Sequence, residues 1–304
     1  MNNQKENSNN KVNNNETSLY YHCNKNLEKS KNHEPSSLIN TGFSNIDKTL
    51  QGLHPGKLYV IAGAEGMPKA LLAGQMALNV ADHSGVLYMP VLESASRLTN
   101  RLIRAVADIS DTDLEHVPWD NKRVALVEKT MDSFKTKKLF IDKLWRYDEE
   151  ELLHLIESYI KDQDVSMIII DDEKCLFSRM KKKLSSHEKY HFLLKLKMLL
   201  RKSDCCGVLL KKIKPAEQTE DNPYRLPSVK DFRTGYNLAE LADEIWMIHR
   251  LEYYGLMVDG DNNKTTGRTE LYHIDEYESV RNTLYFTFKS GATYLKVLED
   301  PASQ

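Results

Sequence analysis

The middle of the chain alternates between short continuous apolar runs and longer stretches in which apolar residues recur every three or four positions. Short unbroken runs are typical of strands that are covered on both faces of a sheet, and the recurring pattern is typical of amphipathic helices. The runs that predict strands lie at residues 57–62, 85–90, 138–141, 165–170, 206–210 and 244–249.

Helical patterns fill the intervals between these strands. The pattern over 97–106 places four apolar residues on one side of a helix, namely Leu98, Leu102, Ile103 and Val106. Other helices are predicted at 69–81, 148–159, 187–201 and 237–242, and smaller helical pieces over 112–134 are interrupted at Pro118. After a turn-rich loop at 258–268, strand-like segments follow at 270–274, 283–288 and 293–297. This order predicts an α/β fold with a largely parallel central sheet, helices on both faces and antiparallel C-terminal strands.

The N-terminal residues have a different composition from the rest. Asn supplies twelve of the first forty positions, and Lys, Glu and Ser fill much of the remainder. Such a segment buries too little apolar surface to offset the entropy lost on ordering. We therefore expect a disordered Asn-rich tail over 1–37, one domain over 38–299 and a short tail over 300–304.

Charge and cysteine content narrow the functional classes. The net charge is −2 and the pI is about 6.6, so nucleic acid could be bound only through a local basic patch. The four cysteines have no CxxC spacing, which indicates reduced thiols in a cytoplasmic protein. Together with His249 and His273 they show no metal-ligand spacing, and we interpret all of them as structural. No run reaches the length of a membrane span, and the N-terminus lacks the apolar core of a secretory signal.

The stretch between the first strand and the first long helix has the layout of a phosphate-binding loop. Such a loop follows the pattern G-x-x-x-x-G-K-[S/T], whose backbone N–H groups and lysine hold phosphates while the hydroxyl holds Mg²⁺. Here the loop consists of Gly63, Ala64, Glu65, Gly66, Met67, Pro68, Lys69 and Ala70. Gly63 and Lys69 fit the pattern, whereas Pro68 removes an N–H donor and Ala70 removes the hydroxyl. The alternative is a plain strand–loop–helix turn with a solvated lysine.

Several motifs in order resemble one family. The lead-in T-G-F-x-x-I-D-x-x-x-x-G-L-x-x-G-x-L-x-x-I-A at 41–62 and M-P-K at 67–69 are similar to the RecA-like ATPase domain of DnaB-type replicative helicases. Leu92-Glu93 resembles that family's S-L-E-M motif, Ile168 to Asp171 its Walker B strand, and Asp231-Phe-Arg233 its D-L-R-E-S-G segment. The lead-in alone is shared with the related RadA and KaiC groups. The resemblance covers roughly 41–298, with the Asn-rich tail in place of the family's N-terminal helical domain.

The resemblance implies a fold and a set of catalytic roles. The fold is that of a RecA-like P-loop NTPase, and the cofactors are ATP and Mg²⁺. Glu93 takes the place of the glutamate that polarises the attacking water, and Asp171 that of the aspartate that orients the Mg²⁺ shell. The alternatives are a surface glutamate at a strand end and an aspartate that caps the next segment.

The resemblance also implies sites for DNA and for a neighbouring subunit. Arg233 takes the place of a contact to the DNA backbone. Lys211 and Lys212 depart from the family, which has S-Q at these positions, but they belong to basic runs at 179–183, 201–202 and 211–214 that could bind phosphates. Arg233, Lys211 and Lys212 are therefore the candidate DNA-binding residues. Solvated helix faces and strand ends are the alternative for the basic runs. The family's K-x-R pair reaches a neighbour's phosphates, and a gapless match places Asp275 and Tyr277 at those positions.

These substitutions lead to three hypotheses about function. The first is a catalytically impaired DnaB-like domain that acts in DNA replication as a DNA-binding or accessory subunit. The second is an active ATP-dependent helicase with 5′–3′ unwinding, and the third is a RecA-like scaffold that binds neither ATP nor DNA. Expected partners are single-stranded DNA, a replication protein or intact helicase, and further copies of the chain. Formation of a hexamer would lack the family's N-terminal linker helix.

Overall fold

The computed structural model describes residues 20, 23, 38–91, 93–110, 118–143, 146–214, 225–232, 234–275, 279–288 and 294–299. The chain divides into the units Met1–Leu38 and Ile39–Gln304, and the fold below is that of the second unit. The tails predicted over 1–37 and 300–304 lie outside the described residues, apart from Tyr20 and Cys23.

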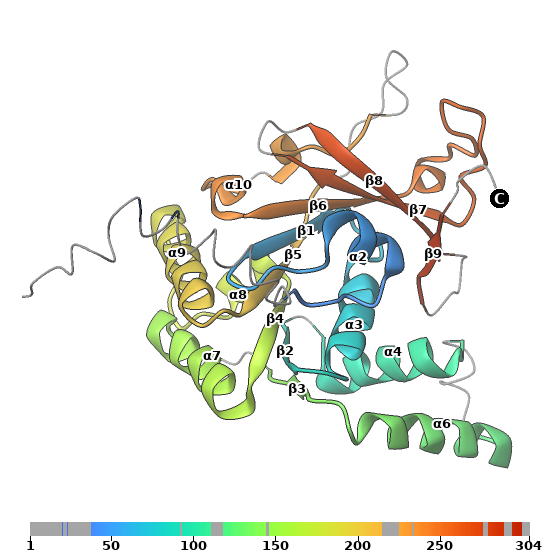
Figure 1. The fold of residues 1–304 in the computed structure, drawn as a ribbon, viewed down its shortest axis with the longest axis horizontal. Helices are drawn as coiled ribbons and strands as arrows, with labels where there is room; N and C mark the ends of the chain where they lie inside the picture. Colours follow the sequence, from blue (N-terminus) through green and yellow to red (C-terminus); the bar gives the residue numbers. More distant parts are fainter. Residues whose placement is uncertain are drawn as a thin grey trace, which may run out of the picture. The chain divides into compact units, whose positions relative to one another are not determined.

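A single mixed sheet contains the nine strands of the described residues, in the order β3-β2-β4-β5-β1-β6-β7-β8-β9 (Figure 1). The first six in this order run parallel, and β7, β8 and β9 continue the sheet by antiparallel pairing. The strands are β1 Leu58–Gly63, β2 Gly85–Pro90, β3 Leu139–Ile141, β4 Val165–Asp171, β5 Cys206–Lys212, β6 Glu244–His249, β7 Arg268–Ile274, β8 Val280–Thr287 and β9 Lys296–Leu298. The predicted fold class is therefore confirmed.

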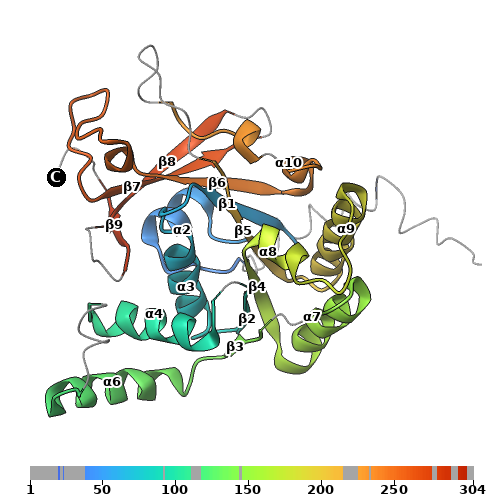
Figure 2. The same ribbon diagram turned by 180° about the vertical axis from the view of Figure 1, so that it is seen from behind.

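Two helical layers cover the two faces of this sheet, as the opposite views in Figures 1 and 2 show. In β1, Leu58 and Val60 belong to the core cluster formed with α7, α8 and α9, and Tyr59 and Ile61 to the cluster formed with α2, α3 and α4. The helices are α2 Ser44–Leu50, α3 Lys69–Val80, α4 Ala95–Ala107, α6 Asn121–Phe134, α7 Glu149–Gln163, α8 Glu173–Ser178, α9 Ser186–Lys202 and α10 Leu238–Leu241, with short 3-10 turns at Val229–Phe232 and Leu251–Tyr254. Alternate residues thus face opposite cores, and the strands read as continuous apolar runs.

The helix starts follow from local sequence signals. In α7 the Asp148 side chain accepts from the Glu151 backbone N–H while the Glu151 side chain accepts from the Asp148 N–H, and Ser185 and Glu188 form the same capping box at α9. These reciprocal bonds satisfy backbone N–H groups that have no partner within the helix. The acidic first turn that predicted the helix at 148–159 is part of this cap.

Some details of the structure differ from the simplest interpretation of the sequence, and other predictions lie outside the described residues. Val106 is 47% exposed, although it shares the helical face of α4 with buried Leu98 and Leu102. Helical spacing indicates which residues share one face of a helix, but not how much of that face the neighbouring elements cover. The segment predicted as a strand at 293–297 pairs instead at Lys296–Leu298, and the short helix α8 was not predicted. Residues 112–117, the start of the predicted helical pieces, are outside the described part of the chain.

Candidate functional site

The loop at 63–70 joins β1 to α3 at the carboxyl edge of the parallel strands, which confirms the predicted strand–loop–helix layout. Since β1 lies between β5 and β6, the ends of both strands flank the loop. Gly66 has a φ of 78°, a backbone conformation that side-chain-bearing residues rarely adopt. A Cβ at Gly66 would lie 3.2 Å from the Tyr253 ring, so this glycine also permits the close approach of that ring. The loop therefore occupies the edge at which open α/β sheets bind ligands.

Lys69, the first residue of α3, has its ammonium turned onto its own loop. Its Nζ donates to the backbone oxygens of Gly63 and Ala64, at 2.9 and 2.7 Å. Burial lowers the pKa of Lys69 to about 8, while the nearby Asp172 and Asp171 carboxylates act in the opposite direction. A phosphate bound here would have to replace or share these two carbonyl contacts.

Pro68 and Ala70 keep the shape of the loop but remove two groups that a phosphate-binding loop uses. Pro68 precedes α3 with a φ of −78°, which suits its ring, and its carbonyl accepts from the Leu72 N–H at 3.0 Å. It has no N–H to offer a phosphate. Ala70 lies in the first turn of α3 and has no side-chain oxygen. The helix start is thus well formed without the donor and the hydroxyl.

Glu93 and Asp171 lie close together and share one cation. The guanidinium of Arg101, from α4, approaches both Glu93 oxygens: Nη2 lies 2.6 Å from Oε1, and Nη1 donates to Oε2 at 3.0 Å. Nη2 also lies 3.9 Å from Oδ2 of Asp171, which accepts from the Tyr88 hydroxyl at 2.9 Å. The structure therefore brings together the two predicted carboxylates, with a positive charge between them.

Both carboxylates are less acidic than usual. Burial raises the pKa of Glu93 and of Asp171, and in each case the Arg101 guanidinium opposes the shift. Asp172, not Asp171, caps the following helix: its Oδ1 accepts from the Lys174 N–H at 2.8 Å and from the Cys175 N–H at 3.4 Å. The capping alternative weighed for Asp171 thus belongs to its neighbour.

The side chains around the loop do not fit the Mg²⁺ site that the resemblance implies. The side chain at position 70 offers no oxygen, and one Asp171 oxygen already accepts from Tyr88 and faces Arg101. In the described part of the chain, no three His, Cys, Asp or Glu side chains are grouped so that they could hold a metal ion. Octahedral Mg²⁺ needs accessible oxygen ligands. No catalytic step through a metal follows from this arrangement.

The basic pair at the end of β5 is divided between the interior and the surface. Lys211 is buried, and its Nζ lies 2.6 Å from Oε2 of Glu173, which is buried as well. The other Glu173 oxygen accepts from the Tyr236 hydroxyl. Lys212 is exposed and pairs with Glu65 at 2.6 Å. The Lys211 ammonium is thus turned away from solvent, and only Lys212 of this pair presents its charge at the surface.

Three further predicted positions remain. Arg233 and Tyr277 lie outside the described residues. Asp275 follows β7, which runs antiparallel to β6, so it lies at the amino edge of the parallel strands and not beside Lys69. Its backbone N–H donates to the Ser279 oxygen at 2.9 Å. Within one chain Asp275 therefore does not belong to the loop site, and a contact with phosphate there would need a second subunit.

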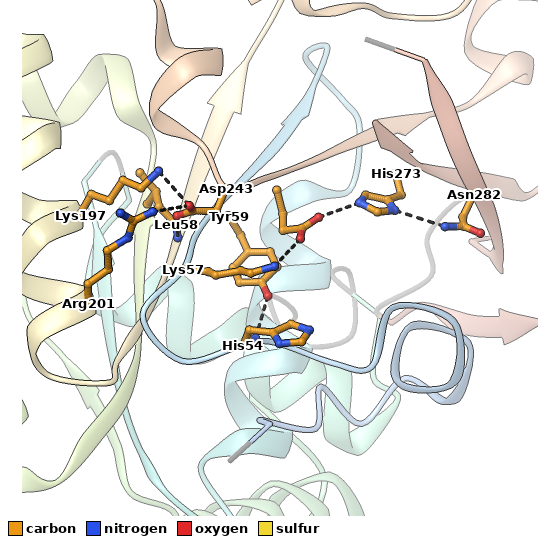
Figure 3. A network of polar contacts seen from close by, with 10 residues as sticks. His54, Lys57, Leu58, Tyr59, Lys197, Arg201, Asp243, His273 and Asn282 are labelled. Carbon is orange, nitrogen blue, oxygen red and sulfur yellow. Dashed lines mark hydrogen bonds and ion pairs between the residues drawn. The ribbon is translucent and has the colours of Figure 1, made fainter. Parts of the chain in front are cut away.

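The amino edge carries a polar network of its own (Figure 3). Asp243 accepts from the Leu58 backbone N–H and from Arg201 of α9 at 2.9 Å each, and forms an ion pair with Lys197 of α9 at 2.9 Å. One carboxylate thus joins the start of β1 to α9. No single motif in the sequence indicates this junction, because its members are far apart along the chain.

Glu244 extends the network on the other side of β1. It lies 2.7 Å from both Lys57 Nζ and His273 Nε2, and Asn282 contacts the other nitrogen of that ring at 3.3 Å (Figure 3). Although burial alone would raise its pKa, these two partners lower the pKa of Glu244 to about 2. A cavity of about 580 Å³ opens beside Lys57, Glu244, His273 and Arg281.

Sequence reasoning missed Arg101 and Tyr88 at the loop site. Arg101 was one charged residue among several on an amphipathic helix, and Tyr88 lay in an apolar strand. A partial signal existed for Arg101. It lies eight positions after Glu93, on the helix whose N-cap, Ser94, directly follows Glu93. His249, interpreted as structural, is buried beside Tyr254 and Tyr272, and burial lowers its pKa to about 4.

Comparison with known proteins identifies relatives of this chain. The model of the DnaB-like helicase C-terminal domain matches residues 39–289. Replicative DNA helicase DnaB of Haemophilus influenzae is 25% identical over 258 residues, which are 81% of this chain and 52% of that protein. Replicative DNA helicase DnaB of Leifsonia xyli is 23% identical over 232 residues, 75% of this chain and 50% of that protein. The chain thus spans about half the length of the curated relatives it matches.

Solved structures show the same fold. One of them, an ATPase domain, superposes with a TM-score of 0.77 at 17% identity, over 93% of this chain and 99% of its own. A DnaB-like replicative helicase, described with its interactions with primase, has a TM-score of 0.77 at 16% identity, over 93% of this chain and 69% of its own. At these identities the likeness extends to the fold alone. None of the helices in the described residues is long and apolar enough to span a bilayer.

Proposed function

The chain belongs to the family of DnaB-like helicase C-terminal domains, and from this membership we propose that it acts in DNA replication as a helicase-related subunit with impaired ATP turnover. In this proposal it contributes DNA binding or an accessory contact to a replication protein or an intact helicase. One observation carries the proposal: the loop at 63–70 retains its strand, turn and helix, but lacks an N–H at Pro68 and a hydroxyl at Ala70.

The contacts around the loop support impaired turnover. Glu93, in the place of the water-polarising residue, is engaged by both terminal nitrogens of Arg101. Lys69 is engaged by two carbonyls of its own loop. Catalysis of phosphoryl transfer comes almost entirely from positioned charges. Charges that are replaced, or that are already paired within the protein, therefore lower the rate directly. Asp275, where the family has a cation that reaches a neighbour, would bring the opposite charge.

Nucleotide affinity tests this part of the proposal. Binding of a fluorescent ATP analogue is measured with and without Mg²⁺ for the wild type and for Lys69→Ala, with Lys212→Ala as the matched control on the exposed lysine. We expect weak binding that Mg²⁺ does not strengthen. Mg²⁺-dependent binding in the range of about 1 μM that Lys69→Ala abolishes would contradict the proposal.

A repair variant makes the same test in the opposite direction. Pro68→Gly/Ala70→Thr restores one N–H and one hydroxyl, and each hydrogen bond to a charged group is worth about 1.5–3 kcal/mol. Affinity in the presence of Mg²⁺ should rise by about tenfold or more. An unchanged affinity in a folded variant would show that these two positions do not limit binding.

The DNA-binding part rests on family membership and on exposed basic residues. Arg179, Lys183 and Lys212 are exposed in the structure. Binding of single-stranded DNA should weaken linearly on a logarithmic salt scale, by about 0.7 units of slope for each phosphate contacted. Replacing these three by Ala should flatten the slope, whereas Lys48→Ala/Lys135→Ala, on other exposed surfaces, should not. Absence of affinity at low salt would favour a scaffold that binds neither ligand.

One observation favours the active helicase as a second candidate. Lys69, Glu93 and Asp171 all lie at the carboxyl edge, and the Lys69 ammonium lies within the electrostatic reach of Asp171. An enzyme with these groups could supply the missing ones from elsewhere. DNA-stimulated phosphate release that is lost in Glu93→Gln would identify this case.

A further inference from the structure

The carboxylate pair at the carboxyl edge already has a cation, supplied by the protein itself. Glu93, Arg101 and Asp171 have side chains that are 18%, 18% and 19% exposed, so water screens their charges only in part. Arg101 Nη1 donates to Oε2 of Glu93, and Nη2 forms a close ion pair with Oε1 at 2.6 Å. A hydrogen bond between two charged groups is stronger than one between neutral groups. The same Nη2 donates to the Tyr88 hydroxyl at 3.3 Å, and that hydroxyl in turn donates to Asp171.

We propose that Arg101 replaces a divalent cation at this site, so that Glu93 and Asp171 are neutralised by the guanidinium and no metal ion binds between them. The proposal depends on the proposed function only for the identity of the site. It assigns Arg101 a positioning role toward the two carboxylates.

Two features of the site exclude a second cation. A Mg²⁺ ion lies about 2 Å from its oxygen ligands, and Asp171 Oδ2 lies 3.9 Å from Arg101 Nη2. An ion on that oxygen would thus lie within about 6 Å of the guanidinium, where like charges repel strongly in a partly buried site. Ala70 adds no ligand that could offset the repulsion.

The position of Arg101 is enforced by the packing of its helix. Ser94 caps α4 directly after Glu93, by accepting from the Arg97 N–H at 3.1 Å. Leu102, the next residue in α4, packs against α3 so closely that a Cβ added at Gly74 would lie 3.1 Å from its Cδ2. Since α4 is held against α3, the guanidinium is held at the ends of β2 and β4.

The proposal can be tested without nucleotide or turnover, by titrating the protein with Mn²⁺ alone. Binding is monitored by the loss of the free-ion signal in electron paramagnetic resonance. The wild type should show no saturable binding in the millimolar range. Arg101→Met should bind Mn²⁺ about tenfold or more tightly than the wild type, because two partly buried carboxylates then have no cation. Arg101→Lys should behave like the wild type, and Arg101→Met/Glu93→Gln should lose the new site.

Each outcome has a definite meaning. Saturable Mn²⁺ binding by the wild type that Asp171→Asn abolishes would overturn the proposal, and so would failure of a folded Arg101→Met to bind. If Arg101→Met does not fold, the wild-type and Arg101→Lys titrations still test the proposal, because saturable Mn²⁺ binding by either protein would contradict it. Metal binding by the wild type without ATP affinity would refute this inference alone, whereas tight metal-dependent ATP affinity would refute the proposed function.

Discussion

Asp243 and Glu244, at the amino edge of β1 and β6, each bind groups from other elements, and the low pKa of Glu244 shows that the ionised form is favoured there (Figure 3). At the carboxyl edge, by contrast, burial raises the pKa of Glu93 and Asp171 and lowers that of Lys69. For Glu244 the partners more than offset desolvation, whereas for Glu93, Asp171 and Lys69 desolvation prevails. Charges that are left less stable than in water are typical of functional sites.

The two edges therefore serve different purposes. Asp243 joins β1 to α9 and stabilises the sheet. The charged groups around the loop at 63–70 keep pKa values that are shifted by burial, as in a ligand site, although the loop lacks the N–H at position 68 and the hydroxyl at position 70. The perturbation comes from burial, which the fold imposes, and not from Pro68 or Ala70, so it is compatible with the proposed loss of ATP turnover.

The largest effect is expected at the amino edge, from Asp243→Ala. Lys197 would be left without its carboxylate at a side-chain exposure of 11%, and the Leu58 N–H would lose its acceptor. Breaking a buried pair on one side costs about 3–5 kcal/mol, which urea unfolding would measure. Glu65→Ala, which removes an exposed acid at the other edge, should leave the unfolding midpoint unchanged. A loss below about 1 kcal/mol would mean that Asp243 behaves as a surface residue.

A second variant asks whether the carboxyl edge also contains a purely structural pair. Lys211→Met leaves Glu173 buried, with Tyr236 as its remaining partner, and should destabilise the fold by about 3 kcal/mol. Lys211→Met/Glu173→Gln removes both charges and should recover more than half of that loss. Equal stability of the two variants would contradict a structural role for the pair, and reduced DNA affinity with unchanged stability would restore Lys211 as a DNA contact.

The smallest effect concerns the protonation of Lys69. Its folded pKa of about 8 lies below its ordinary value of 10.5, so the unfolded chain binds more protons between these two values. The free energy of unfolding should therefore rise with pH between about 8 and 10.5. Lys69→Met, which has no ammonium at this position, should lack this contribution to the rise. Labelling by an amine-selective reagent, followed by mass spectrometry, should show a midpoint near pH 8 for Lys69. For Lys212, whose pKa the Glu65 hydrogen bond raises above 10.5, labelling should rise only at higher pH. A Lys69 midpoint above about pH 10 would show that burial does not perturb it.

Much of the fold was predictable because its signals are local. Apolar runs marked all six parallel strands, and the acidic first turn marked the start of α7. The loop and its substitutions were also legible, since a missing N–H or hydroxyl is a property of the residue itself. The separation of Lys211 from Lys212 was not predictable: neighbouring strand residues face opposite sides, but only the packing of α8 shows which side is covered.

The sequence by itself thus determined the fold class, the family and the chemical content of the loop, because each depends on the order and type of neighbouring residues. Tertiary structure alone decided which charges meet. Arg101 reaches Asp171 from a different part of the chain, Lys69 turns onto its own loop, and Asp243 joins β1 to α9. Such contacts depend on how helices pack on the sheet, and the free energy of a partly buried charge depends on its few nearest partners.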